Sequence, residues 1–499
     1  MKTIYQLLEN TIRTFPHRPI YYRNPHSVIT YEQFGKKVDK FQSLLQKNNV
    51  GKGDKCVIIS NNSPKTSALI HAIFKQGAVI VPTYQKQRVE DKLHIINETE
   101  PKIVFNTGQT INTSSTTYNE INHENIVIDN NYYLKETDVG SSDLAAILYT
   151  SGTSGLPKGV MLTHSNIVSN LEAIDERFKN NICEINELDK CVSFLPINHC
   201  YGLVCESLYN TMKGSSMYIN TDISNLKSDF TKYNPTVLCA VPRLFQMIYS
   251  KMPIQKSMYL SFAGRRINNL LKSQVFGKNI RHATCGGAPI DTELLKYFHL
   301  LDLQIYQGYG STECSPMISL NAGSSNVYGS VGKILKNVKV KFTENNEVMV
   351  SGPNVSKGYY KNHSNSFVME ENEMWYKTGD LGHLDNEYLY IDGRESNTYK
   401  LSNGKFVNPE ELECILCRIP SISQCMIFTP DGITNMAIIV SNESENKIKH
   451  EIENLKNHIK GYEFPTKLLV IKEPFSESLL TQKQSLKRKL ILNEFKNVI

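Results

Sequence analysis

The chain has 499 residues, of which 40% are hydrophobic and 21% are charged. That length exceeds what one hydrophobic core organises, and it predicts two to four domains of ordinary globular composition. The 55 basic and 49 acidic residues leave a net charge of +6, too weak for this length to indicate nucleic-acid binding. A mildly positive surface suits anionic small ligands, and it equally suits a solvated, lysine-rich exterior.

The eleven cysteines are scattered and odd in number, and the amphipathic first fifteen residues do not have the pattern of a secretion signal. We therefore expect reduced thiols in a cytoplasmic protein. Cys414 and Cys417 form a C-x-x-C pair, but no second pair has zinc spacing, so we interpret them as packed thiols on a helix. The most apolar stretch, residues 68–81, is short and interrupted by polar side chains, which predicts at most peripheral membrane contact.

The pattern from residue 56 onward is strand, helix, strand. A β-branched run covers residues 56–60, and Ser63 and Pro64 then supply an N-cap and a first-turn proline. Gly77 ends this helix before the next strand, 78–82. Because strands that alternate with helices form parallel βαβ units, we predict an α/β fold with a large lobe of doubly wound, parallel-type sheets. Further buried strands are expected at 103–105, 126–128, 145–149, 236–241, 282–285 and 304–306.

The character of the chain changes at the turn-forming stretch 392–394. Helices are then expected over 410–417 and 447–460, and strands over 424–428, 436–440 and 467–471. This is enough for a separate α+β unit of about 105 residues. We predict a large N-terminal domain over 1–393 and a small mobile C-terminal domain over 394–499. The polar segment 106–122 is expected to be a surface loop.

Residues 148–164 read LYTSGTSGLPKGVMLTH, an apolar strand that runs into a loop of hydroxyls, glycines and one lysine. Backbone N–H groups of glycine-rich turns, hydroxyls and a lysine together suit an oligophosphate. A Walker-type P-loop is excluded, because its glycine spacing is longer and its lysine precedes Ser or Thr. A flexible linker would lack the flanking buried strand. The predicted phosphate ligands are Thr150, Ser151, Gly152, Thr153, Ser154, Gly155 and Lys158.

This loop resembles the phosphate-binding loop of the AMP-forming acyl-adenylate synthetases, which include acyl-CoA ligases, peptide-synthetase adenylation domains and luciferases. Further motifs follow in the order of that family. Residues 195–202, LPINHCYG, resemble its L-P-x-x-H-x-x-G element, which implies that His199 lies between the nucleotide and the acyl pocket. Residues 286–289, GGAP, match the backbone shelf that receives adenine, here Gly287, Ala288 and Pro289.

The segment 307–313, QGYGSTE, is a second strong match to the family. By resemblance, Tyr309 offers an aromatic face to adenine, Gly310 belongs to the nucleotide-binding residues, and Thr312 offers a hydroxyl to the α-phosphate. Glu313 is the implied Mg²⁺ ligand, together with Thr150, since a carboxylate supplies the hard oxygen that Mg²⁺ prefers.

Residues 375–382, WYKTGDLG, complete the nucleotide site by resemblance. Asp380 would accept both ribose hydroxyls, and Arg394 would contact ribose and phosphate. Residues 400–413 resemble the loop that enters for the second half-reaction, where the Asn403-Gly404 turn would line a pantetheine tunnel. This loop and residues 235–245 are most similar to long-chain fatty acyl-CoA ligases.

The chain departs from the family near its end. Members carry a near-terminal lysine that bridges the carboxylate and the α-phosphate, but the simplest alignment of LTQKQSLKRK places Ser485 there. Lys483 or Lys487 could replace it after a local shift, and we favour Lys483. The hinge residue, usually Asp or Lys, is Ser396. Loss of one oriented charge at the reacting centre costs roughly 10²–10³ in rate.

The resemblance implies ATP-dependent activation of a carboxylic acid, expected to be a long-chain fatty acid, to acyl-AMP. Rotation of the small domain about Ser396 would then let CoA thiol displace AMP. The implied catalytic residues are Thr150, His199, Glu313 and Lys483. Two alternatives stay open: transfer of the acyl group to a carrier protein, and a degenerate member that holds ATP or acyl-AMP without turnover.

Overall fold

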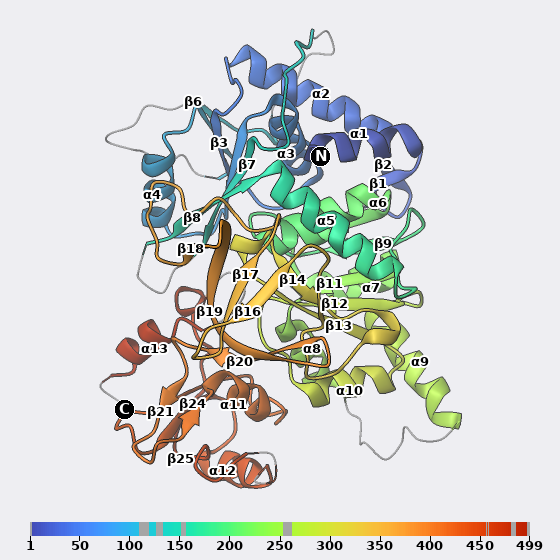
Figure 1. Cartoon of the computed structure of the whole chain (residues 1–499). Coiled ribbons are helices and arrows are strands. Elements are labelled where there is room, and N and C mark those ends of the chain that lie inside the picture. The colour runs from blue at the N-terminus through green and yellow to red at the C-terminus, as the bar shows by residue number, and fades with distance from the viewer. Residues whose placement is uncertain are drawn as a thin grey trace.

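The computed structural model describes residues 2–108, 119–125, 133–150, 156–252, 262–455, 457, 459–480 and 486–496 (Figure 1). Within these ranges no helix is both long and apolar enough to cross a membrane. The expected strand at 126–128 and the core of the phosphate loop, Ser151 to Gly155, lie outside the described residues, as do Lys483 and Ser485.

A six-stranded sheet organises the first part of the N-terminal lobe, in the order β6-β5-β3-β4-β7-β8. Its strands are parallel except β8, which runs antiparallel to β7. They are β3 (Lys55–Ile59), β4 (Val79–Thr83), β5 (Ile103–Asn106), β6 (Asn119–Ile121), β7 (Leu144–Thr150) and β8 (Lys158–Thr163). The accompanying helices are α1 (Ile4–Thr14), α2 (Tyr31–Lys47), α3 (Pro64–Gln76), α4 (Val89–Thr99) and α5 (His164–Lys179).

The expected local signals set the ends of α3. The side chain of Ser63 accepts a hydrogen bond from the Thr66 backbone N–H, Pro64 occupies the first turn, and Gly77 ends the helix with φ 70°. The prediction for this helix and its flanking strands is confirmed.

A fourteen-stranded sheet forms the rest of the lobe, and it has two halves. One half is parallel apart from the β1–β2 hairpin, and consists of β1 (Pro19–Asn24), β2 (Ser27–Thr30), β9 (Lys190–Ser193), β10 (Ser216–Ile219), β11 (Val237–Ala240), β12 (His282–Cys285) and β13 (Gln304–Gly310). The other half is antiparallel and was not anticipated from the sequence. It contains β14 (Met317–Leu320), β15 (Lys333–Ile334), β16 (Lys339–Phe342), β17 (Glu347–Ser351), β18 (Phe367–Glu370), β19 (Glu373–Asp385) and β20 (Tyr388–Arg394).

Short helices connect and flank this second sheet. They are the π-helix η1 (Tyr201–Leu208), α6 (Tyr209–Lys213), η2 (Ile223–Asn225), α7 (Leu226–Tyr233), α8 (Pro242–Lys251), α9 (Phe262–Phe276), α10 (Thr292–Leu300), η4 (Thr312–Cys314) and η5 (Gly323–Ser325).

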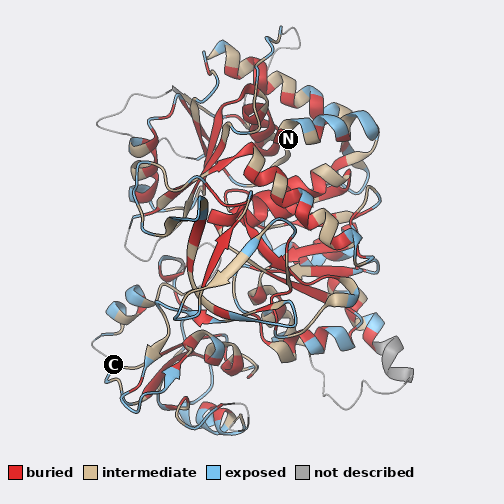
Figure 2. Cartoon of the chain, viewed as in Figure 1, coloured by how far each residue is buried: buried red, intermediate tan, exposed pale blue. Residues whose placement is uncertain are grey.

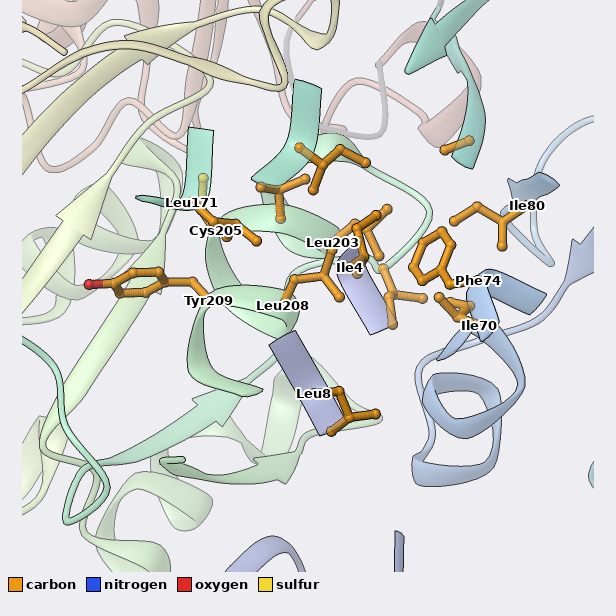
Figure 3. Close-up of a cluster of buried hydrophobic side chains, with 14 of the residues drawn as sticks. Ile4, Leu8, Ile70, Phe74, Ile80, Leu171, Leu203, Cys205, Leu208 and Tyr209 are labelled. Carbon is orange, nitrogen blue, oxygen red and sulfur yellow. The ribbon is translucent and has the colours of Figure 1, made fainter. Parts of the chain in front are cut away.

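The largest buried cluster joins the two sheets of the lobe (Figure 2). Apolar side chains of α1, α3, α5 and η1 meet in it, among them Leu8, Phe74, Leu171 and Leu203 (Figure 3). Because η1 contributes to this core, the loop that precedes η1 is attached to the most buried part of the lobe.

The last hundred residues form a smaller α+β unit with two hydrophobic clusters of its own, next to β20 in Figure 1. Its three-stranded sheet has the order β23-β24-β25, antiparallel and then parallel. The elements are β21 (Tyr399–Lys400), β22 (Phe406–Val407), α11 (Pro409–Leu416), β23 (Gln424–Phe428), β24 (Asn435–Val440), α12 (Glu445–Glu453), β25 (Pro465–Ile471), η7 (Glu477–Leu479) and α13 (Arg488–Glu494).

Two predictions of local structure were wrong in part. Residues 119–121 of the expected surface loop form β6, because they pair in register with the buried strand β5. The helix expected over 447–460 ends at Glu453, where the Leu455 N–H donates to Ile452 O in a tight turn. Tertiary pairing and a local turn thus override composition at these positions.

Candidate active site

A carboxylate from within β19 meets a phenol from the end of β13 and a guanidinium from the end of β20. Asp380 on β19 lies opposite Arg394 on β20 in the antiparallel ladder. The Arg394 Nε donates to Asp380 Oδ1 over 2.9 Å, and the Tyr309 hydroxyl, from the end of β13, donates to Asp380 Oδ2 over 2.7 Å. The sequence motifs that contain these three residues are therefore brought into one cluster.

The electrostatics keep Tyr309 and Arg394 in their hydrogen-bond-donating forms. Burial, followed by the negative charge of Asp380, raises the pKa of Tyr309, so its phenol stays a neutral donor. Asp380 in turn raises the pKa of Arg394. Since a carboxylate has about four acceptor positions, Asp380 retains about two after these bonds, enough for a vicinal diol.

A second cluster surrounds Glu313, which lies on the short helix η4 and is buried. The Tyr359 hydroxyl donates to Glu313 Oε1 over 2.8 Å, and the Ser356 backbone N–H donates to Glu313 O over 2.7 Å. Burial, followed by the charge of Glu313, raises the pKa of Tyr359. Because this side-chain partner is a neutral phenol, the negative charge of Glu313 is available to a cation, which fits a hard divalent ion.

The phosphate-loop hairpin is attached to the Glu313 cluster through Tyr359. Lys158 begins β8 opposite Thr150 at the end of β7, and its Nζ lies 5.5 Å from the centre of the Tyr359 ring. The Tyr360 backbone N–H donates to Gly159 O over 2.7 Å. A side chain at Gly159 would approach Ile147 to 2.7 Å, so only glycine fits there. Thr150, Lys158 and Glu313 thus belong to one connected group.

The predicted adenine shelf follows β12 and lies beside η1. Gly287 has φ 88°, a conformation that side chains disfavour, and Ala288 and Pro289 continue the turn. The Tyr201 hydroxyl is 3.1 Å from Thr284 Oγ1 at the end of β12. The start of η1, and with it the preceding loop, therefore borders the shelf.

His199 occupies the loop immediately before η1 and is half-buried. Its backbone N–H donates to Pro196 O over 3.0 Å, and its Nδ1 accepts a 3.3 Å bond from the Tyr201 N–H. A nitrogen that accepts is unprotonated, so a neutral His199 carries its hydrogen on Nε2.

The turn that follows Tyr309 needs its glycine. A Cβ at Gly310 would lie 1.8 Å from Pro316 O, so no larger residue fits without a backbone shift. Thr312 follows, buried beside Glu313. Gly310, Thr312 and Glu313 are thus held in a short, tightly folded connection between β13 and β14.

The C-terminal unit contacts the N-terminal lobe through α11 and the residues after it. Arg418 donates from Nε and Nη2 to Asp291 Oδ2, over 2.8 and 2.6 Å, while Asp291 Oδ1 caps α10. The Cys414 thiol lies 3.7 Å from Pro289 O at the end of the shelf. Cys417 Sγ is also 3.7 Å from Cys425 Sγ, and all eleven cysteines, each within the described ranges, are free thiols.

The Asn403-Gly404 turn joins β21 to β22, with Gly404 at φ 84°. Its contacts lie within the C-terminal unit: the Ser402 N–H donates to Gly432 O, and Lys405 lies over the Tyr462 ring. In this arrangement the turn is not grouped with the clusters around Asp380 and Glu313.

Lys487, from the end of the terminal lysine segment, lies near Arg88 at the start of α4. Lys487 donates to Ser478 O over 3.0 Å, and burial and then the charge of Arg88, next to α4, lower its pKa. On α4, His94 Nε2 lies 3.1 Å from Pro157 O at the end of the phosphate loop. Of the three candidate positions in this segment, only Lys487 belongs to the described residues.

Sequence reasoning missed Tyr359 and the Arg418–Asp291 pair. Tyr359 lies in a Gly-Tyr-Tyr stretch that has the local pattern of a plain turn, and Arg418 follows a helix as an ordinary basic residue. Their partners lie 46 and 127 positions away, so no local pattern could have identified them.

Known proteins resemble this chain over most of its length. Residues 8–360 match the sequence profile of the family described as AMP-binding enzyme. Long chain acyl-CoA synthetase 7, peroxisomal, from Arabidopsis thaliana is 24% identical over 564 residues, covering 93% of this chain and 80% of that protein. The chloroplastic long-chain-fatty-acid–[acyl-carrier-protein] ligase of the same plant is also 24% identical, over 617 residues, covering 96% and 83%.

Solved structures share the whole architecture. The crystal structure of ATP-bound MatB from Rhodopseudomonas palustris matches with a TM-score of 0.80 at 20% identity, covering 100% of both chains. At that identity the likeness establishes the fold, which is the predicted α/β architecture with a smaller C-terminal unit.

Proposed function

This chain belongs to the AMP-binding enzyme family, and on that premise we propose that it activates a carboxylic acid with ATP and transfers the acyl group to CoA. The carboxylate attacks the α-phosphorus of ATP, pyrophosphate leaves, and the thiol of CoA then displaces AMP from acyl-AMP. The observation that carries the proposal is that residues far apart in the sequence are hydrogen-bonded in each cluster, Tyr309 to Asp380 and Tyr359 to Glu313.

The nucleoside would be held by the Asp380 cluster. The two remaining acceptor positions of Asp380 suit the two ribose hydroxyls, and Arg394, which is bonded to Asp380, would contact ribose or phosphate. The ring of Tyr309 offers a flat face to adenine, and the backbone of Gly287, Ala288 and Pro289 offers a shelf without bulky side chains.

The phosphates would be held by the loop from Thr150 to Lys158, with the hydroxyl of Thr312 at the α-phosphate. Glu313 and Thr150 are the proposed ligands of Mg²⁺, which, when bound, neutralises charge that develops on the phosphoryl oxygens. Among the described residues no group of three or more His, Cys, Asp or Glu side chains forms a metal site. One carboxylate that shares the ion with substrate phosphates is the usual arrangement for Mg²⁺.

His199 borders the shelf and would lie between nucleotide and acyl group. We propose a long-chain fatty acid as the substrate, supported by the motifs at 235–245 and 400–413 and by the names of the curated relatives. Transfer to an acyl carrier protein is the second candidate, since one relative is named as such a ligase.

We propose domains over 1–393 and 394–499, with Ser396 as the hinge. After adenylation the small domain would turn, withdraw the terminal lysine segment, and bring the Asn403-Gly404 turn to the site for CoA. Lys483 remains the proposed catalytic lysine, and the position of Lys487 beside α4 supports placing this segment near the phosphates. One site would thus serve two reactions in turn.

Pyrophosphate exchange into ATP, dependent on an added acid, tests the first half-reaction. A panel of short, aromatic and long-chain acids, scored by AMP release with CoA, with holo-carrier protein and with neither, identifies the acid and the acceptor. We expect exchange with palmitate-like acids and thioester formation with CoA. Activity with only short or aromatic acids would refute the chain-length proposal. A complete absence of exchange at high enzyme concentration, with ATP still bound, would instead favour a non-catalytic binder.

A further inference from the structure

The loop that contains His199 is fixed from one side by a helix of unusual winding. The π-helix η1 begins two residues after His199 and spans Tyr201–Leu208. A Cβ at Gly202 would lie 2.3 Å from Pro196 O, so the helix packs directly on the loop backbone. Its apolar side chains, including Leu203 and Leu208, are buried in the lobe core (Figure 3). π-Helical turns frequently occur at functional sites.

Glu206 lies on η1 and is 1% exposed. The Ser193 hydroxyl, at the end of β9, donates to Glu206 Oε2 over 2.6 Å. The backbone N–H groups of Phe194 and Leu195 also stabilise its charged form. Glu206 therefore connects η1 to the first residues of the loop that contains His199.

A second side chain, Asn62, which lies just before α3, holds the next part of the same loop. Asn62 donates to Leu195 O over 2.7 Å and accepts from the Ile197 N–H over 2.9 Å. Glu206 binds the residues immediately before that point. Together they hold the backbone from Ser193 to Ile197, so the path of the chain into His199 is set before η1 begins.

The second carboxyl oxygen of Glu206, Oε1, makes no hydrogen bond to this loop. Oε1 is buried and has no hydrogen-bond partner among the described residues. Glu206 lines a small cavity of about 10 Å³, which has room for one water molecule. The polar lining of this cavity includes Tyr21, Ser67 and Ser207. A carboxyl group in such a place is costly unless it is neutral or has a strong partner.

We propose that Glu206 is a positioning residue that fixes the loop from Phe194 to Cys200 and thereby aims His199 at the reacting groups. The proposal rests on the role proposed above for His199. Glu206 acts in its neutral form, with Oε2 accepting from Ser193 and the hydroxyl hydrogen on Oε1. Ionisation strengthens the bonds from Ser193, Phe194 and Leu195, but it also places a full charge on a carboxylate that is 1% exposed and whose Oε1 has no partner among the described residues. We expect this uncompensated charge to draw water into the loop and loosen it.

The ionisation of the neighbourhood supports this role. Burial raises the pKa of Glu206 to about 8, and the Ser193 hydrogen bond only partly offsets it. The ionisable groups that interact with its charge are Tyr21 from β1, Cys191 from β9 and Cys239 from β11. Burial raises the pKa of Tyr21 and of Cys239 to about 12, and it raises the pKa of Cys191 well above its usual value. Among these four groups, only Glu206 has a pKa near 8.

The experiment compares Glu206→Gln, Glu206→Leu and the exposed control Glu184→Gln in the full chain. Glutamine keeps the acceptor for Ser193 and never ionises, whereas leucine removes the clamp. We expect kcat for adenylation to fall about 10²-fold in Glu206→Leu, because a displacement of about 1 Å at the reacting centre has that effect. The dissociation constant for ATP should stay unchanged. The wild-type rate should fall above pH 8, and Glu206→Gln should lack that fall.

A second readout does not depend on activity. The imidazole NMR signal of His199 in the ligand-free protein, assigned with His199→Gln, should shift in Glu206→Leu and stay unchanged in Glu184→Gln. If the chain proves inactive, this signal still tests the positioning role of Glu206. A failure of the proposed function can therefore be told apart from a failure of the positioning proposal. If Glu206→Leu does not fold, the pH profile and NMR signal of Glu206→Gln decide. An unmoved His199 signal in Glu206→Leu, or a fall above pH 8 retained by Glu206→Gln, would overturn the proposal.

Discussion

The hydroxyl of Tyr359 donates a 2.8 Å hydrogen bond to Glu313 Oε1, while the ring of the same residue lies under Lys158. One side chain thus orients the proposed metal ligand and contacts the first residue of β8. Neither interaction involves a substrate, so both exist before ATP binds. Tyr359 is therefore expected to preorganise the phosphate end of the site.

Tyr359→Phe should weaken binding of Mg-ATP without unfolding the protein. The variant keeps the ring under Lys158 but removes the bond to Glu313. A hydrogen bond to a charged group contributes about 1.5–3 kcal/mol, so the dissociation constant should rise roughly 10- to 10²-fold. Calorimetric titration with ATP, with and without Mg²⁺, measures the effect, which should be larger when Mg²⁺ is present.

The matched control for this experiment is the adjacent Tyr360→Phe, since the Tyr360 ring faces Lys55 and Lys361 rather than the site. The affinity of Tyr360→Phe for Mg-ATP should equal that of the wild type. Equal losses in the two variants, or a loss independent of Mg²⁺, would contradict the orienting role of Tyr359.

Asp380→Asn should weaken binding of the nucleoside itself. The amide presents one oxygen where the carboxylate presents two, and Arg394 loses its ion-pair partner. We expect the dissociation constants of ATP and AMP to rise together by about 10²-fold, in the range for breaking a hydrogen-bonded charge pair. Fluorescence or calorimetric titration with both nucleotides measures this. Asp385→Asn, an exposed change on the same strand, is the control, and a loss confined to ATP would argue against ribose binding by Asp380.

Local signals predicted the elements that carry the site, and long-range pairing decided the rest. The helix from Pro64 to Gln76 was predictable because Ser63 and Pro64 mark its start and Gly77 follows its last residue directly. The antiparallel half of the large sheet was not. Although β16–β17, β18–β19 and β19–β20 are hairpins of neighbouring strands, the half is assembled by longer-range pairings such as that of β15 with β20. Asp380 and Arg394 were found from motifs, but their mutual bond depends on the register of β19 with β20.

The contacts of Arg418 illustrate the same limit. An arginine after a helix has many exposed environments, and only the docking of the C-terminal unit gives it Asp291 as a partner. Residue type and spacing thus predicted which groups the site contains. Strand register and the docking of the C-terminal unit on the N-terminal lobe determined which of these groups touch.

Arg418→Met should weaken the contact between the C-terminal unit and the lobe. Asp291 is 6% exposed, so loss of the arginine leaves a buried carboxylate with its Oδ2 unpaired, at a cost of about 3 kcal/mol. The measurement is fluorescence energy transfer between dyes on the two units, combined with a double-mutant cycle that includes Asp291→Asn. We expect a longer mean distance and a coupling energy above about 1 kcal/mol.

The exposed pair of Lys447 and Glu443 provides the control for the lobe contact. Lys447→Met should change stability by less than about 0.5 kcal/mol, as for other surface ion pairs. An unchanged interlobe distance in Arg418→Met would show that other contacts, such as the one between Cys414 and Pro289, suffice to dock the unit.

His71 should make the lobe sensitive to acid. It is 1% exposed between Phe34 and Phe74, neither ring nitrogen has a partner among the described residues, and burial lowers its pKa to about 3. A histidine with a folded pKa below its unfolded value of about 6.5 contributes stability that is present above pH 6.5 and is lost as pH falls toward 3. The loss should reach about 2 kcal/mol at pH 5, at about 1.4 kcal/mol per pH unit.

His71→Leu removes the ionisable group, so its melting temperature should fall less than that of the wild type between pH 7 and pH 5. The exposed His383→Gln should follow the wild type, and parallel melting curves for all three proteins would show that His71 does not govern the acid response.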